Sequence, residues 1–100
     1  MNTMEDMVAR ELAMAIMPHL GDDYKKRFDE EIELENGVSV FVNGVVYYST
    51  SYEEETNYYY TVDVSVDIDG IKVYDADGDK IEMRLNQRAI ERYMAQYIEE

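Results

Sequence analysis

Residues 56–69 read TNYYYTVDVSVDID, and their alternation decides the fold. From Tyr58 to Ile68 the even positions carry apolar side chains, whereas the odd positions, apart from Tyr59, carry polar or acidic ones. Successive side chains of a strand point to opposite faces of a sheet, so this pattern predicts a long strand. We expect one face of that strand in the core and the face with Asp63, Asp67 and Asp69 in water.

The alternation extends upstream, where Asn36-Gly37 interrupts it. A two-residue turn would place Glu35 on the apolar face, whereas a three-residue loop with Gly37 at positive φ pairs Leu34 with Val38. The second register keeps the apolar positions together. We therefore predict a bulged hairpin.

Further glycine signals leave two connections open. Asn43-Gly44 favours one long bent strand over residues 38–52, with Gly44 as a bulge, over a second tight hairpin. Asp69-Gly70 fits either a turn or a bulge, after which the apolar phase resumes. Residues 75–79, which read DADGD, predict a turn before a short strand over residues 81–83.

Two helices are predicted to flank these strands. The first covers residues 3–17, with Thr3 as N-cap and a buried stripe formed by Met4, Val8, Leu12, Ala15 and Ile16. Met7, Met14 and Met17 widen that stripe into a face suited to a dimer or to a pliable binding surface. The second follows the N-cap Asn86, and its apolar residues recur at helical spacing.

Residues 22–30 are predicted to form a further short helix, because Tyr24 and Phe28 stand four apart. The whole chain of 100 residues then forms one domain. Its expected class is α+β: an N-terminal helix, an antiparallel meander of four or five strands and a C-terminal helix, with the helices on one sheet face.

Composition limits the compartment and the chemistry. The chain contains no cysteine, which excludes disulfides, thiolate catalysis and cysteine-based zinc sites. Its first six residues lack the basic start of a secretion signal, and no apolar run approaches the roughly 20 residues that a membrane span needs. We therefore expect a cytoplasmic protein without a membrane partner.

Charge is the most informative bulk property: 23 Asp and Glu oppose 9 Lys and Arg, for a net charge of -14. Binding to nucleic acid needs cationic side chains that displace counterions, so this balance argues against nucleic acid as a direct partner. From Phe28 to Ile71 the chain has eleven carboxylates and no Lys, Arg or His. Surfaces that are charged only for solubility normally mix both signs.

The residues for nucleophilic catalysis are missing. His19 is the only histidine, and the chain has neither a cysteine nor a serine elbow to pair with it. We therefore predict no enzymatic activity and no cofactor.

Residues 75–80, which read DADGDK, begin like a calcium loop. However, Lys80 occupies the position that needs glycine, and Asn86 stands where a bidentate glutamate should close the site. We predict a plain turn, with Asp75, Asp77 and Asp79 as weak metal candidates and a calcium-binding module as an alternative.

Tyrosines and acids gather between Tyr47 and Tyr60. Tyrosine is enriched where protein surfaces bind other proteins. Alternate carboxylates of a strand lie roughly 6 to 7 Å apart at about 3.3 Å per residue, close to the spacing of neighbouring phosphates. Acidic outer faces also protect strands from edge-to-edge association. The predicted partner-binding residues are Glu53, Glu54, Glu55, Tyr59, Asp63, Asp67 and Asp69.

Size, acidity, the absence of cysteine and the run VDVSVDIDGIKVYDADGDKIE (residues 62–82) resemble small acidic proteins of bacteriophages and mobile elements. These include nucleic-acid mimics that block host defence proteins such as CRISPR effectors. The resemblance implies a viral inhibitor of the anti-CRISPR type, acting in the host cytoplasm. It rests on overall features and carries over no functional residue.

These patterns favour a non-enzymatic protein-binding module that occupies a basic, nucleic-acid-binding surface of a partner protein. The alternative is a structural or assembly module. In that case Met7, Met14 and Met17 are buried in a homodimer, and the acidity serves solubility.

Overall fold

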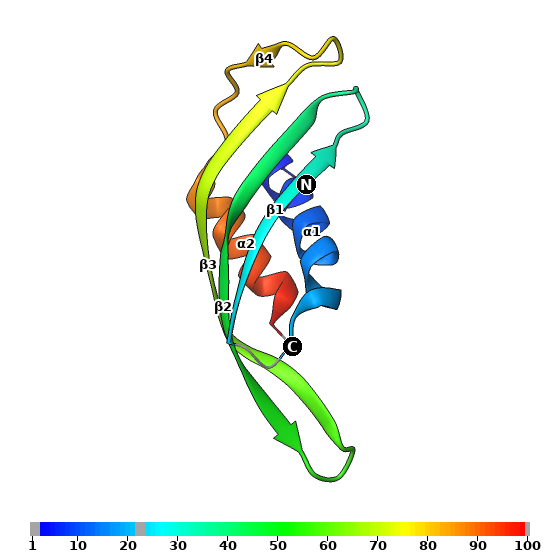
Figure 1. Ribbon diagram of the computed structural model, residues 1–100, viewed down its shortest axis with the longest axis vertical. Helices are drawn as coiled ribbons and strands as arrows, with labels where there is room; N and C mark the ends of the chain where they lie inside the picture. The colour runs from blue at the N-terminus through cyan, green and yellow to red at the C-terminus, as the bar shows by residue number, and fades with distance from the viewer. Residues whose placement is uncertain (1–2, 22–23, 100) are drawn as a thin grey trace.

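The computed structural model describes residues 3–21 and 24–99. In chain order the elements are α1 (Met4–Ile16), η1 (Met17–His19), β1 (Lys25–Glu33), β2 (Ser39–Glu53), β3 (Tyr58–Tyr74), β4 (Lys80–Ile81) and α2 (Gln87–Ile98). The strands form one antiparallel sheet in the order β1-β2-β3-β4, and α1 and α2 lie on the same side of it (Figure 1). The predicted α+β architecture is confirmed, with four strands. Neither α1 nor α2 is long and apolar enough to cross a membrane.

Both helices begin at the predicted caps. The Thr3 side-chain oxygen accepts a hydrogen bond from the backbone N–H of Asp6 at 3.1 Å. The Asn86 side-chain oxygen accepts one from the backbone N–H of Ala89, also at 3.1 Å. These bonds satisfy amides that have no partner inside the helix. The buried stripe of α1 consists of Val8, Ala9, Leu12, Ala13 and Ile16, so two alanines take the place predicted for Met4 and Ala15.

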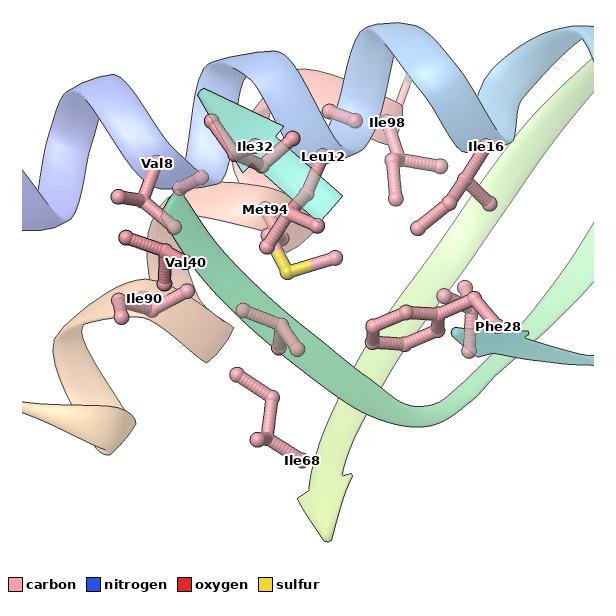
Figure 2. Packing of buried hydrophobic residues seen from close by; sticks show 14 of the residues in the cluster. Val8, Leu12, Ile16, Phe28, Ile32, Val40, Ile68, Ile90, Met94 and Ile98 are labelled. Carbon is pink, nitrogen blue, oxygen red and sulfur yellow. The ribbon is translucent and has the colours of Figure 1, made fainter. Parts of the chain in front are cut away.

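The core lies between the two helices and the inner face of the sheet. Figure 2 shows the side chain of Met94 from α2 among those of Leu12, Val40 and Phe28. Leu12, Val40 and Met94 are fully buried. Burying a Leu, Val or Met side chain stabilises a fold by about 1.5–3 kcal/mol. The packing of these residues therefore fixes both helices on one face and leaves the other face of the sheet uncovered.

The first hairpin has the predicted register. The backbone N–H of Leu34 donates to the carbonyl oxygen of Val38 at 2.8 Å, and that of Gly37 donates to the carbonyl of Leu34 at 3.0 Å. Gly37 has a φ of 81°, a conformation that glycine adopts without a steric penalty. The bulged three-residue loop is confirmed.

The helix predicted over residues 22–30 is wrong. From Lys25 onward the segment is β1, which pairs with β2 from Lys25↔Tyr47 to Glu33↔Ser39. Phe28 and Ile32 are buried, and a spacing of four suits a strand face as well as a helix, because inward positions recur every second residue. Asp22 and Asp23 lie outside the described residues.

The long strand predicted over residues 38–52 is confirmed as β2, and Asp69-Gly70 proves to be a bulge. Asn43 pairs with Gly70 and Gly44 pairs with Ile68, so Asp69 is the extra residue. The bulge therefore lies in β3, opposite the position predicted for it at Gly44. A Cβ on Gly44 would clash with the carbonyl oxygen of Asp67, so the two backbones meet closely here.

Two polar contacts connect the ends of the chain. Tyr97 of α2 donates a hydrogen bond to the carboxylate of Asp6 in α1, and Glu5 accepts one from the backbone N–H of Asn86 at 3.0 Å. The Asp6 hydrogen bond raises the pKa of the Tyr97 phenol, and partial desolvation and the negative charge of Asp6 raise that pKa further. Each effect favours the neutral phenol, which keeps the proton that the hydrogen bond needs.

Candidate functional site

A two-stranded arm extends from the body of the protein. We define it as residues 49–62: the end of β2, the turn that follows and the start of β3. Its cross-strand pairs run from Ser49↔Val62 to Glu53↔Tyr58. No residue of this range is buried, and Figure 1 shows the arm projecting past the ends of both helices. The molecule measures 51 Å along its longest axis but only 27 and 20 Å along the others.

A register shift sets the direction of the arm. Tyr47 pairs with Ser65, whereas Ser49 pairs with Val62, so the shift inserts unequal numbers of residues into the two strands. Asp63, within this irregularity, has a φ of 53°, which side chains other than glycine adopt rarely. Such bulges bend a strand and increase its twist. The sequence predicted that the alternation of residues 56–69 would place Tyr58 and Tyr60 in the core. That prediction is wrong, because neither residue is buried.

Tyr48 anchors the base of the arm. Its side chain is only 4% exposed. Its hydroxyl donates to the carbonyl oxygen of Gly21 at 2.9 Å and accepts from the N–H of the same residue at 3.1 Å. The fixed end of the arm is therefore connected to the chain that follows α1.

Tyrosines cover both faces of the arm. The rings of Tyr52 and Tyr59, which are cross-strand partners, lie 4.7 Å apart between centroids. On the other face the rings of Tyr58 and Tyr60 are nearly parallel, with centroids 6.5 Å apart. Tyr59 remains 63% exposed and Tyr58 51% exposed. A cross-strand aromatic pair such as Tyr52 and Tyr59 stabilises a ribbon that has no core of its own. Together with Tyr58, the pair also presents a large aromatic surface to solvent.

The tip of the arm carries only negative charge. Glu53, Glu54 and Glu55 are exposed, and the arm contains no Lys, Arg or His. The turn closes at Asn57, which has a φ of 55° and whose side-chain oxygen accepts a hydrogen bond from the Tyr52 hydroxyl. Within residues 3–21 and 24–99, none of these carboxylates lies within ion-pair distance of a cation.

The structure separates the predicted partner-binding residues. Glu53–Glu55 and Tyr59 lie at the tip of the arm, and Asp63 lies at its base. Asp67 and Asp69 belong to the body, and Asp69 is the bulged residue. Val45, the partner of Asp67, is eight residues from Glu53, or roughly 26 Å at about 3.3 Å per residue. Only the tip therefore forms a compact group.

The face of the sheet opposite the helices is here called the outer face. Strand pairing places cations beside the acidic residues on this face. Arg27 of β1 and Asp67 of β3 are both opposite Val45 of β2, one on each side. In the same way Glu31 and Lys72 flank Phe41. The segment from Phe28 to Ile71 has no cation in sequence, but its outer face therefore carries both signs. In the arm, by contrast, all the charged side chains are negative.

The methionines of the predicted dimer face point away from the core. Met7 is 41% exposed, Met14 62% and Met17 37%. Arg10 and Glu11 stand between them in sequence and are exposed as well. The face is therefore a mixed surface, with three separate apolar side chains.

The weak metal candidates form a turn. One carboxylate oxygen of Asp75 accepts hydrogen bonds from the backbone N–H groups of Asp77 and Asp79, each at 2.9 Å. Gly78 has a φ of 88°, as a tight turn requires. In the described ranges no three acidic or histidine side chains are placed to hold a metal ion together.

Comparisons of this chain with protein-family models, with curated proteins and with solved structures found no match.

Proposed function

We propose that this protein is a non-enzymatic acidic binding module, and that its arm enters a basic, nucleic-acid-binding groove of a partner protein. The observation that supports this most is the composition of the arm. It exposes three tyrosines and three glutamates, has a fourth tyrosine that is half-buried, has no cation and contributes no buried residue to the core.

Each part of the arm has a role in such a complex. Exposed tyrosines supply contact area at a low cost in side-chain entropy. The glutamates at the tip match the charge that a phosphate-binding groove selects, and they speed the encounter with a basic surface. A nucleic acid and the arm then compete for one groove. An inhibitor of the type that the resemblance implies, acting on a CRISPR effector or a similar defence protein, would work by this competition.

The experiment measures binding to a panel of purified nucleic-acid-binding proteins that includes CRISPR effectors. Affinity is determined over a range of salt concentrations, with and without the cognate nucleic acid. We expect affinity that falls steeply with salt and is lost when nucleic acid fills the groove.

A matched pair of variants separates the arm from bulk charge. Glu53→Gln, Glu54→Gln and Glu55→Gln together remove three charges from the tip. Asp77→Asn, Asp79→Asn and Glu82→Gln together remove three exposed charges at the opposite end of the sheet. The first variant should weaken binding about tenfold or more, and the second only slightly. Equal losses, affinity indifferent to salt, or no binding to any member of the panel would contradict the proposal.

A homodimer through α1 is the second candidate, and the exposed methionines support it. Two copies would bring net charges of -14 together, so this association should strengthen as salt rises. Light scattering at low micromolar concentration tests it, with Met14→Ser as the variant. A monomer at both low and high salt would contradict this candidate.

A further inference from the structure

A groove of about 740 Å³ lies on the outer face of the sheet, at the end opposite the arm. The residues around it that matter here are Asp29, Glu33, Phe41, Lys72, Tyr74 and Asp75. The hairpin loop at Gly37 and the turn at Ala76 close one end, because a Cβ on Gly37 would lie 2.9 Å from the Ala76 Cβ. A volume of about 300–1,000 Å³ is typical of sites that bind small groups.

The floor of the groove is aromatic. Phe41 belongs to the central strand, yet it is 36% exposed because no helix covers this face. Its ring meets that of Tyr74 at 88°, with centroids 5.4 Å apart. The T-shaped contact holds Phe41 in place and leaves part of its surface open to solvent. An open aromatic ring attracts cations through its quadrupole.

The two walls of the groove differ in charge. On the β1 side, Asp29 is opposite Asn43 and Glu33 is opposite Ser39. Glu31, opposite Phe41 itself, stands between them in β1 but is not part of the groove lining. On the β3 side Lys72 is directly opposite Phe41. The walls are two strands apart, or about 9.6 Å. A bound cation is therefore drawn toward β1 and repelled from β3.

Asp75, after the end of β3, also carries negative charge, but one of its carboxylate oxygens already accepts two backbone hydrogen bonds, which fix the side chain in the turn. By contrast, no hydrogen bond or ion pair to the carboxylate of Asp29 or of Glu33 is present within residues 3–21 and 24–99. Asp29 and Glu33 are therefore the β1 carboxylates of the groove whose oxygens are open to a ligand.

We propose that this groove binds an arginine side chain from a protein partner, with the guanidinium stacked on Phe41 and hydrogen-bonded to Asp29 or Glu33. Arginine fits both features at once, because its planar group stacks on an aromatic ring and donates in its own plane to a carboxylate. The ammonium group of lysine is a compact, strongly hydrated charge and fits less well. The site is separate from the arm, so either one can fail without the other.

The test uses three capped tripeptides, Gly-Arg-Gly, Gly-Lys-Gly and Gly-citrulline-Gly. Citrulline keeps the shape of arginine but has no charge. Each is titrated into the full chain while NMR follows the ring signals of Phe41 and Tyr74. The arginine peptide should shift both rings and bind more tightly than the lysine peptide, and it should bind about tenfold more tightly than the citrulline peptide.

Three variants locate the contact. Asp29→Asn with Glu33→Gln should weaken arginine binding about tenfold. The control Glu53→Gln with Glu55→Gln removes the same charge from the arm and should leave peptide binding unchanged. Lys72→Gln should tighten binding, since it removes the repulsion from the β3 wall. The arm control, which removes the same charge elsewhere, distinguishes a local site from general attraction to an acidic protein.

The proposal is overturned if no ring shift occurs, if citrulline binds as well as arginine, or if the arm control weakens binding as much as the groove variant. It is also overturned if the same ring signals shift with protein concentration alone. That result would identify a second copy of this chain as the occupant. Loss of peptide binding in the groove variant, with arm-dependent binding intact, would show that the two sites act separately.

Discussion

The carboxylate of Glu91 in α2 accepts a hydrogen bond from the backbone N–H of Ile68 at 2.7 Å. One turn earlier in α2, the side-chain amide of Gln87 donates to the carbonyl oxygen of the same Ile68, also at 2.7 Å. β4 pairs with β3 only at Val73 and Tyr74. At Ile68 the side chains of α2 therefore supply the backbone hydrogen bonds that a neighbouring strand would otherwise make. The bulge at Asp69 is thereby fixed to α2.

Removing either contact should destabilise the fold. We expect Glu91→Ala to lower the free energy of unfolding by about 1–3 kcal/mol and Gln87→Ala by about 1 kcal/mol, because the hydrogen bond to a charged group is the stronger. Urea denaturation measures both. Gln96→Ala, an exposed change in the same helix, is the control and should stay within about 0.5 kcal/mol of the parent protein.

Gly44 should not tolerate a side chain. A Cβ there would lie 2.9 Å from the Cα of Ile68 and closer still to the carbonyl oxygen of Asp67, so a backbone has to move. We expect Gly44→Ala to cost about 1–3 kcal/mol. Around Gly21 no atom of a residue in the described ranges, its chain neighbours aside, lies within 4 Å of the added Cβ. Thermal unfolding of Gly21→Ala should therefore match that of the parent, and equal losses in the two variants would contradict this account.

Tyr48 and Tyr47 form a matched pair for testing the base of the arm. Tyr48→Phe removes both hydrogen bonds to Gly21 and should cost about 1–2 kcal/mol. The neighbouring Tyr47 is 42% exposed, and the Lys25 Nζ lies 5.9 Å from the centroid of its ring. Tyr47→Phe keeps that ring and should change the free energy of unfolding by less than about 0.5 kcal/mol.

Tyr97 should lose its proton at higher pH than an ordinary tyrosine. Its raised pKa means that its hydrogen bond stabilises the fold fully below the pKa of the unfolded chain. The contribution is lost as the pH rises through the higher pKa of the folded state. NMR of the tyrosine ring carbons measures this titration. Asp6→Ala should lower the pKa of Tyr97, whereas the exposed change Glu11→Gln should leave it in place.

The arm should be dispensable for folding. Replacing residues 50–61 by Asn-Gly keeps the Ser49↔Val62 pair and offers a two-residue hairpin turn. Because the removed residues contribute nothing to the core, we expect cooperative unfolding and unchanged helix content by circular dichroism. Binding to a basic partner should be lost. A shortened protein that fails to fold would show that the arm has a structural role.

Local chemistry in the sequence predicted much of the fold. The caps Thr3 and Asn86 and the pairing of Leu34 with Val38 each depend on residues within a few positions of one another. Residues 25–30 of β1 were missed because β1 is an edge strand with charged side chains on both faces, and only Phe28 and Ile32 mark the inner one. Two such positions spaced four apart also fit a helix.

The arm was missed because the length of the long strand was not compared with that of the helices. At about 1.5 Å per residue the 13 residues of α1 cover roughly 20 Å, whereas the 17 residues of β3 reach roughly 56 Å at about 3.3 Å per residue. Helices of this size cannot cover the whole strand, whatever its alternation. That mismatch could be read from the sequence.

The candidate sites depend on pairings between distant residues, which alternation does not reveal. Arg27 and Lys72 join the outer face only because β1 and β3 both pair with β2. Phe41 occupies a position in the polar phase of its strand. An aromatic residue at such a position is the one local feature of the sequence that points to a binding site on the outer face.

β3 runs without a break from the arm to the groove, from Tyr58 to Tyr74. It would therefore hold the two proposed binding sites at a set distance from each other. A partner that engages both would gain avidity only if its own two contact points matched that separation. Selectivity among basic proteins would then come from geometry, since many share the charge and few share the spacing.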